Sequence, residues 1–223
     1  MPPQTTSFDA STRQRLEALV NKARIDLAND VTDRLRRLGI QDGGVALNLD
    51  TIPGLTEADR VAGVAFRDLI AHHLDNAPGR PEKEAPGFAR WEASARADAY
   101  ARVVRDTGFT ALNRLVALRM AEVRGVIDFP ILAQGTASQG FRPFNAVANG
   151  ALGDRDATYR ACLEAYFDEL AVDLPALFDR SAPESRFFPT PSCLKALLEA
   201  LNATDIAPLW AEDEAIGWIY QYY

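Results

Sequence analysis

The residue types that most often perform chemistry are scarce in this chain of 223 residues. His72 and His73 are its two histidines, and neighbouring helical positions point about 100° apart. The pair therefore cannot bind one metal ion from one helix face, although Asp68 is placed four residues before His72 for a histidine–carboxylate contact. A metal site needs at least one more ligand than this segment supplies, so we expect a structural role for both histidines.

Nucleophilic catalysis has no better support. Cys162 and Cys193 lie in apolar segments without a recognisable motif, and the chain has no Gly-x-Ser-x-Gly elbow. We expect both to be buried thiols without a disulfide, as is typical of a cytoplasmic protein. The loop Gln134–Asn149 contains Gly135 and Gly140, but no Gly-Lys-Ser/Thr follows, so it is not a phosphate-binding loop.

Arginine is the most frequent cation, since only three of the 24 basic residues are lysine. Arg114 and Arg119 lie beside the apolar stripe of an expected helix. They either contact phosphate or form ion pairs with acids such as Glu92, Asp98 or Asp106. We favour ion pairs, because acids are equally frequent in this half of the chain.

Arg142 is the third candidate for a contact with DNA or a partner. It lies between Phe141 and Phe144 in the longest irregular stretch of the sequence, where exposed contact surfaces are often found. The alternative is that this stretch is a plain connector.

The net charge of −7 is unevenly distributed. Residues 1–124 hold 18 basic against 17 acidic residues, a net charge of +1, and residues 125–223 hold 6 against 14, a net charge of −8. An acidic chain lacks the basic footprint of a self-sufficient nucleic-acid binder. No run of about 18 apolar residues and no secretory signal occur, so we expect a cytoplasmic protein without a membrane partner.

Apolar periodicity predicts a mostly α fold, a multi-helix bundle with at most a minor short β element at Val45–Leu49. The first helix begins near Asp9 or Ser11 and ends at Gly39, and the second begins at Thr56 with a capping box. Further helices are expected at about 89–105, 107–124, 154–170 and 192–201, followed by a terminal helix.

Composition divides the chain into four parts, which form either one bundle or two helical subdomains. Residues 1–10 are expected to be disordered, and 11–125 to form a helical subdomain with a proline-rich linker near 75–88. A long loop is expected at 126–153. Residues 154–223 then form a second helical subdomain.

The terminal segment is apolar around most of its circumference. Acids at 212–214 suit a helix N-terminus, and two apolar faces follow, made of Ile216, Ile219, Tyr220 and Tyr223, and of Ala211, Ala215, Trp218 and Tyr222. Such a helix must be buried on most sides. It has no Gly or Asn cap after its last aromatic residue, so we expect it to dock on protein that follows, through Trp218, Tyr220, Tyr222 and Tyr223.

Two segments resemble a known family. The string IGWIYQYY at 216–223 is similar to the end of the N-terminal helical region in PglX-like adenine-specific DNA methyltransferases of BREX phage defence and their restriction-modification relatives. Phe109–Gly125 is similar to the family's FNRL-x-A-x-R-x-x-E-x-x-G helix. The matching residues are Asn113, Arg114, Leu115, Arg119 and Glu122.

The resemblance implies an intact enzyme that transfers a methyl group from S-adenosylmethionine to adenine N6 within a specific DNA site. Such an enzyme needs a Gly-rich cofactor turn and an Asn/Asp-Pro-Pro-aromatic tetrapeptide for the flipped base, and the chain has neither. We therefore expect a non-catalytic segment that binds no cofactor itself. Its expected partners are the C-terminal methyltransferase domain of the same polypeptide, DNA in the full-length context, and other proteins of the defence system.

The alternative is a freestanding acidic helical adaptor related to that domain. Its acidic C-terminal half would suit a basic partner or imitate the charge of DNA. Reading the coding sequence beyond Tyr223 separates the two hypotheses, because cofactor and Asn-Pro-Pro-Tyr-type motifs should follow only in the first.

Overall fold

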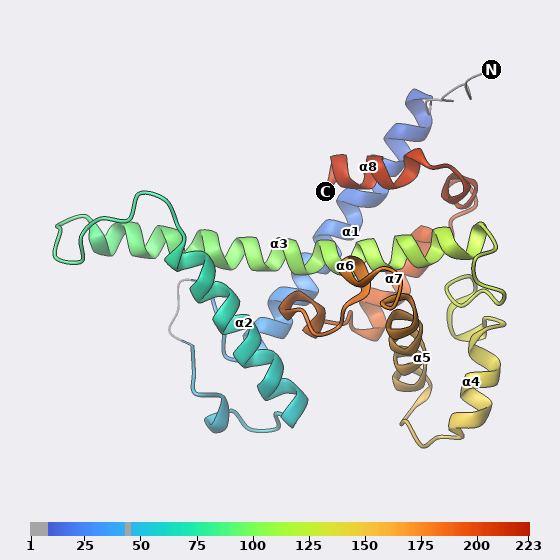
Figure 1. The fold of residues 1–223 in the computed structure, drawn as a ribbon, viewed down its shortest axis with the longest axis horizontal. Helices are drawn as coiled ribbons and strands as arrows, with labels where there is room; N and C mark the ends of the chain where they lie inside the picture. The colour runs from blue at the N-terminus through green and yellow to red at the C-terminus, as the bar shows by residue number, and fades with distance from the viewer. Residues whose placement is uncertain (1–8, 43–45) are drawn as a thin grey trace. The chain divides into compact units, whose positions relative to one another are not determined.

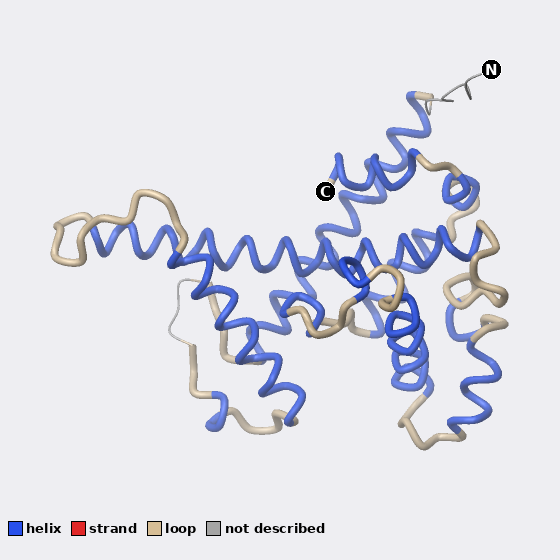
Figure 2. The backbone as a smooth tube through the Cα atoms, in the orientation of Figure 1, coloured by secondary structure: helices blue, strands red, loops and turns tan. Residues whose placement is uncertain are grey.

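A computed structural model describes residues 9–42 and 46–223. Within these ranges all regular secondary structure is helical, which confirms the predicted mostly α fold (Figures 1 and 2). The α-helices are α1 (Ala10–Arg37), α2 (Glu57–Asp75), α3 (Phe88–Val123), α4 (Phe141–Ala148), α5 (Arg155–Leu170), α6 (Pro175–Phe178), α7 (Pro191–Leu201) and α8 (Glu214–Tyr222). Short 3-10 helices are η1 (Leu49–Thr51), η2 (Gly135–Ala137), η3 (Pro183–Arg186) and η4 (Ala207–Ala211).

Two expectations concern segments near the gaps in this description. Of residues 1–10, which are predicted to be disordered, 1–8 lie outside the described residues, and Ala10 is the first residue of α1. Val45, the first residue of the expected strand at 45–49, also lies outside them. The remainder of that strand prediction is wrong, because residues 46–48 are not extended in a ladder and Leu49 begins η1. The side chain of Asn48 accepts a hydrogen bond from the backbone N–H of Asp50, and so caps this turn.

The predicted apolar stripe of α1 is buried along its whole length. Its members are Leu16, Leu19, Val20, Ala23, Leu27, Val31, Leu35 and Leu38. Gly39 adopts a positive φ of 69°, and the N–H of Ile40 returns to the carbonyl of Leu35 at 2.9 Å. This left-handed glycine ends the helix as the sequence indicated.

The predicted start of α2 is confirmed by a reciprocal capping box. The Thr56 hydroxyl accepts from the N–H of Asp59, and the Asp59 carboxylate accepts from the N–H of Thr56 at 2.9 Å. Arg34 of α1 pairs with the same carboxylate. Local polar contacts thus fix where α2 begins.

The two helices expected at 89–105 and 107–124 are a single helix, α3. The expected break between the two ranges falls at Asp106, and no break occurs there. In the structure Val103 and Thr107, on either side of Asp106, are both fully buried, so packed side chains flank the expected break. Tertiary packing overrides local propensity here.

The segment 126–153, expected to be a long loop, contains η2 and the two-turn helix α4. Asn149 ends α4 in a left-handed conformation with φ of 45°. Asp154 then caps α5 through the N–H of Ala157 at 2.8 Å. The expected helices at 154–170 and 192–201 are present as α5 and α7, within a residue or two of their predicted bounds.

The described residues form two compact units made of discontinuous segments. One unit contains residues 9–26, 112–179 and 189–223, and its largest fully buried side chains include Trp210, Phe141 and Phe178. The other contains 27–111, outside the gap at 43–45, and 180–188, with Phe66 and Leu38 in its core. The predicted subdomain boundaries follow chain order instead, and they stay a prediction.

Candidate functional site

The last turns of α3 carry a buried ion pair. Glu122 and Arg119 are both buried, and Arg119 Nη1 donates to Glu122 Oε2 at 3.0 Å. The two residues share a face of the helix because they are three positions apart. A buried carboxylate destabilises a fold unless it is paired and hydrogen-bonded, so the second oxygen of Glu122 also needs donors.

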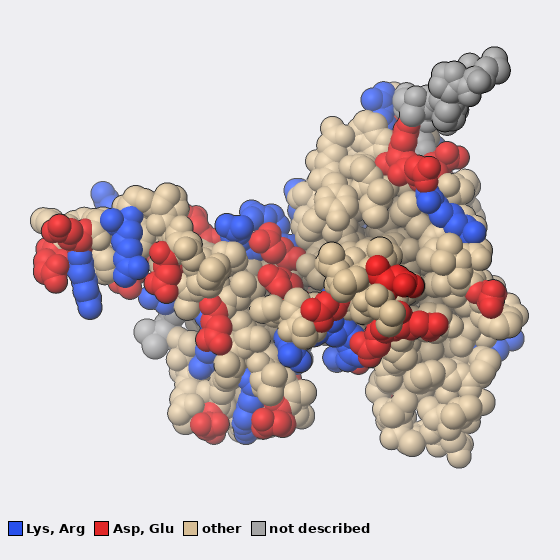
Figure 3. Space-filling view, viewed as in Figure 1, with Lys and Arg blue, Asp and Glu red and all other residues tan. Residues whose placement is uncertain are grey.

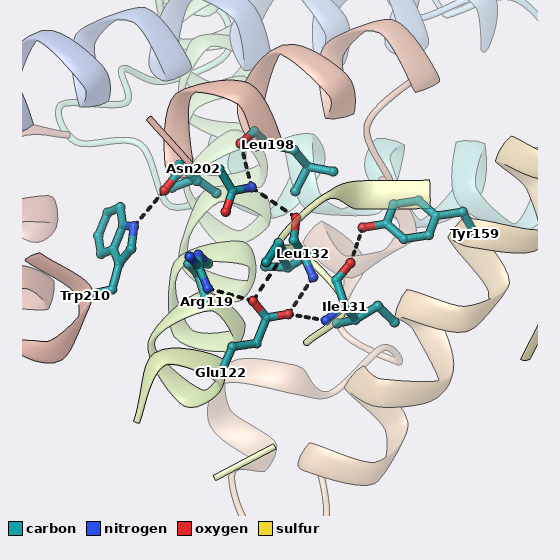
Figure 4. Close-up of polar contacts among 10 residues, drawn as sticks. Arg119, Glu122, Ile131, Leu132, Tyr159, Leu198, Asn202 and Trp210 are labelled. Carbon is teal, nitrogen blue, oxygen red and sulfur yellow. Dashed lines mark hydrogen bonds and ion pairs between the residues drawn. The ribbon is translucent and has the colours of Figure 1, made fainter. Parts of the chain in front are cut away.

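Those donors are backbone groups of the segment that follows Pro130. The N–H groups of Ile131 and Leu132 donate to Glu122 Oε1, and that of Ala133 donates to Oε2 at 3.4 Å (Figure 4). The three donor residues lie outside any helix, so their N–H groups have no partner within regular secondary structure. The carboxylate supplies that partner and fixes the path of the chain after α3.

Two other helices hold the same segment by its carbonyl groups. Tyr159 of α5 donates its hydroxyl to the carbonyl of Ile131 at 2.8 Å (Figure 4). Asn202, at the end of α7, donates to the carbonyl of Leu132 at 3.0 Å. We call Arg119, Glu122, Tyr159 and Asn202, with the backbone of 131–133, the polar network.

The polar network holds backbone groups with side chains in fixed protonation states. Burial raises the pKa of Tyr159 well above its usual value, and the nearby Glu122 carboxylate raises it further, so the phenol remains a neutral donor. Burial also raises the pKa of the neighbouring Cys162 thiol to about 11. Trp210, fully buried, donates its indole N–H to the carbonyl of Leu201 at 2.7 Å beside Asn202.

Arg114 forms a second buried connection from α3. Its side chain is 5% exposed, and Nε donates to the carbonyl of Leu177 at 2.7 Å while Nη2 donates to that of Asp179 at 2.8 Å. The guanidinium also lies 5.8 Å from the ring centre of Phe167. These contacts fix the short α6 segment on α3, with charge-assisted bonds that are stronger than neutral ones.

All five residues that carry the family-like helix motif are therefore buried. Asn113 and Leu115 complete the set with Arg114, Arg119 and Glu122. A motif of this kind reports how the chain packs, because Arg114 and Glu122 bind backbone groups and Arg119 pairs with Glu122.

The burial of Arg114 and Arg119 bears on whether these two residues contact phosphate. Neither guanidinium pairs with Glu92, Asp98 or Asp106 in the contacts described above, yet both Arg114 and Arg119 have buried partners within the chain. The structure thus favours an internal role for both residues, with partners that sequence spacing did not identify. A DNA contact by either residue stays an untested prediction.

Arg142, the third candidate, lies exposed on α4. Its Nε donates to the carbonyl of Ala137 at 3.2 Å. Phe141, which precedes it, is fully buried and meets Tyr159 edge-to-face at 5.1 Å. The side chain of Phe144 is half-buried.

The predicted docking residues on α8 differ in exposure. Trp218 and Tyr222 stack on each other with ring centres 5.5 Å apart, and Arg13 lies 5.5 Å from the centre of the Trp218 ring. Arg24 approaches the carbonyl of Tyr223 at 3.4 Å. Tyr220 remains 57% exposed, so α8 is covered on one side by its own chain and open at Tyr220.

The remaining candidates for chemistry form no further constellation. Within residues 9–42 and 46–223, no group of three His, Cys, Asp or Glu side chains is placed to hold a metal ion. Burial lowers the pKa of His73, with the neighbouring Arg102 cation acting in the same direction. No disulfide joins Cys162 to Cys193, which is half-buried.

Sequence reasoning missed Tyr159, Asn202 and the 131–133 backbone as members of a site. The only local signal was the three-residue spacing of Arg119 and Glu122, which fits an ion pair anywhere on a helix. The partners come from segments up to 83 positions beyond Arg119, and no periodicity links them.

Comparisons with known proteins give one informative match. No family model and no solved structure matches the chain. It is 25% identical over 227 aligned residues to the "Adenine-specific methyltransferase BrxX" of Escherichia coli O9:H4 (strain HS). The match covers 91% of this chain and 17% of that protein's length. No helix of the described residues is long and apolar enough to cross a membrane. The comparison therefore supports the predicted relationship to adenine-specific methyltransferases: this chain is similar, over nearly all of its length, to about a sixth of one such enzyme.

Proposed function

We propose that this chain is a non-catalytic helical region of a site-specific N6-adenine DNA methyltransferase, in a BREX-like phage-defence or restriction-modification system. The observation that carries the proposal is the alignment of 91% of this chain with 17% of a protein named as an adenine-specific methyltransferase. We place the chain in the N-terminal region of the enzyme, because of the two family-like segments in their order.

The motifs of the sequence fit a region without chemistry of its own. The cofactor turn and the base-binding tetrapeptide of an adenine methyltransferase do not occur in it. S-adenosylmethionine is accordingly assigned to the rest of the enzyme, and this chain binds none.

The buried contacts of α3 suit a supporting role. The polar network joins α3 to residues 131–133, α5 and α7, and Arg114 joins it to the α6 segment. Packed elements fixed in this way keep a surface in place for another domain.

That surface includes α8 in our proposal. Tyr220, with Trp218, Tyr222 and Tyr223, contacts the catalytic domain of the same polypeptide, and Tyr220 is the most exposed of the four. Arg142 is the residue through which DNA, or another protein of the defence system, would touch this region.

A methylation assay with tritiated S-adenosylmethionine and unmodified duplex DNA tests the proposal. We expect no transfer by this chain alone and transfer to adenine N6 by the polypeptide of the complete reading frame. Transfer by this chain alone would show that it holds a methyltransferase site. A complete polypeptide that leaves adenine unmodified would remove the proposal and favour the adaptor hypothesis.

A further inference from the structure

The segment that carries α4 is almost without charge. Between Asp128 and Asp154 the only charged residue is Arg142, although 25% of the whole chain is charged. From Pro143 to Gly153 no residue is charged. Figure 3 shows the result on the face in view, where the lower part of α4 and the turn to α5 carry no blue or red atoms.

Apolar side chains are exposed on this uncharged segment. Val147 is 87% exposed and Leu152 is 46% exposed. Pro143 and Ala146 are also exposed, and Phe144 is half-buried. These five residues are called the α4 surface below.

The α4 surface is held in a fixed position. On its inner side, Phe141 packs on Tyr159, a member of the polar network. Arg155 donates to the carbonyl of Thr136 at 2.7 Å, and Gly140 donates its N–H to the carbonyl of Pro130 at 2.9 Å. The exposed apolar face is therefore presented by an anchored helix.

The chemistry of the α4 surface selects a protein as its occupant. Binding of nucleic acid depends on several cations that neutralise several phosphates, and a single cation, Arg142, lies beside the α4 surface. Clustered exposed apolar side chains mark protein contacts. Five side chains are too few for a freely diffusing partner, because stable interfaces bury about 800 Å² on each side.

A tethered partner needs much less contact area. Within one polypeptide, the effective concentration of a linked domain reaches the order of millimolar, so a small apolar contact is sufficient. The aligned region is 17% of the length of the BrxX relative, and most of that relative's chain lies outside it. We infer that the α4 surface is a docking site for the methyltransferase domain of the same polypeptide, an inference that rests on the proposed function.

Hydrogen exchange measured by mass spectrometry tests the inference on two proteins, this chain and the polypeptide of the complete reading frame. We expect the amides of residues 144–148 to exchange at least tenfold more slowly in the complete polypeptide. Val147→Lys should abolish the difference, because a lysine cannot be buried in an apolar contact without a partner. The same substitution should leave the unfolding of this chain alone unchanged, since the side chain is 87% exposed there.

Val172→Lys is the matched control, because Val172 is 82% exposed and follows α5 outside the α4 surface. It should leave the exchange of 144–148 as slow as in the unsubstituted complete polypeptide. Equal loss of protection in both variants would overturn the inference.

The other outcomes separate this inference from the proposed function. Equal exchange at 144–148 in a complete polypeptide that methylates adenine overturns the docking site and leaves the proposed function standing. Protection that appears in this chain alone as its concentration rises identifies a second copy as the occupant, which also overturns the inference. A complete polypeptide that does not methylate adenine removes both.

Discussion

At the residue scale, Glu122 ties the end of α3 to a segment that has no regular secondary structure. Its carboxylate accepts from Arg119 and from the N–H groups of residues 131–133. Without it, a guanidinium and several backbone donors would be buried and unpaired, which is costly in a low-dielectric interior.

Glu122→Gln should therefore lower the free energy of unfolding by about 3 kcal/mol, as expected when one member of a buried pair is neutralised. The amide keeps a single acceptor oxygen and turns a donor group toward other donors. Urea denaturation followed by circular dichroism measures the change. Glu199→Gln is the control, because Glu199 is exposed and its pair with Lys195 is long at 4.0 Å. It should change stability by less than about 0.5 kcal/mol, and equal effects of the two substitutions would contradict the structure.

Tyr159 makes the free energy of unfolding depend on pH in the alkaline range. Burial raises its folded-state pKa above the ordinary value of 10.0, so the unfolded chain loses the phenolic proton first as pH rises. Stability from this group is complete below pH 10 and falls as pH increases above it. Tyr159→Phe should lower stability at pH 7 by about 1 kcal/mol through the lost hydrogen bond to Ile131.

The diagnostic result is the slope of the unfolding free energy against pH. Between pH 9.5 and 11 the unfolding free energy of Tyr159→Phe should fall less steeply than that of the unsubstituted protein. A residual slope will remain, because burial also raises the pKa of Tyr100 and Tyr166. Parallel curves for the two proteins would show that Tyr159 ionises normally.

At the scale of elements, Gly140 shows how closely the segment before α4 approaches its neighbours. A Cβ atom at this position would lie 2.8 Å from the carbonyl oxygen of Phe129 and 3.1 Å from that of Pro130. The turn thus needs a residue without a side chain, for reasons of space and not of backbone angle.

Gly140→Ala should lower the unfolding temperature, with a cost of about 1–3 kcal/mol from the forced shift of backbone. Gly217→Ala is the matched control on α8, where a Cβ atom would meet nothing within 4 Å. It should stabilise the protein by about 0.5–1 kcal/mol, because alanine favours a helix interior over glycine. Differential scanning calorimetry of both variants tests the pair, and a neutral Gly140→Ala would refute the close approach.

At the scale of the whole molecule, charge limits what the chain can bind by itself. A net charge of −7 repels DNA, and Arg114 and Arg119 are buried among internal partners. Exposed Arg142 is left as the candidate among the three arginines selected from the sequence.

We therefore expect this chain to bind duplex DNA with a Kd weaker than about 10 µM at 150 mM salt, in the range of non-specific binding. Fluorescence anisotropy across a salt series measures both affinity and slope. If Arg142 contacts a phosphate, Arg142→Ala should reduce the slope of log K against log salt by about 0.9, whereas Lys195→Ala on the exposed face of α7 should not. Tight binding that is insensitive to salt would contradict this expectation.

Helix positions were well predicted where local signals decide them. The stripe of α1, the Gly39 end, the Thr56 capping box and the start of α5 all follow from contacts between residues a few positions apart. Prediction of helix bounds failed where tertiary contacts decide whether a segment is helical. Asp106 does not interrupt α3, and α4 forms within a stretch of Gly, Pro and Asn, because packing supplies what propensity lacks.

The sequence by itself determined a helical protein, the apolar faces of its main helices, and a resemblance to adenine-specific methyltransferases. Only the tertiary structure decided what the polar residues of the α3 motif do. Periodicity shows that Arg114, Arg119 and Glu122 lie beside an apolar stripe. The same periodicity occurs whether such a side chain is exposed to water or binds a distant carbonyl or N–H group. The partners at 131–133 and 177–179 reach these residues through the folded path of the chain, so their hydrogen bonds exist only in three dimensions.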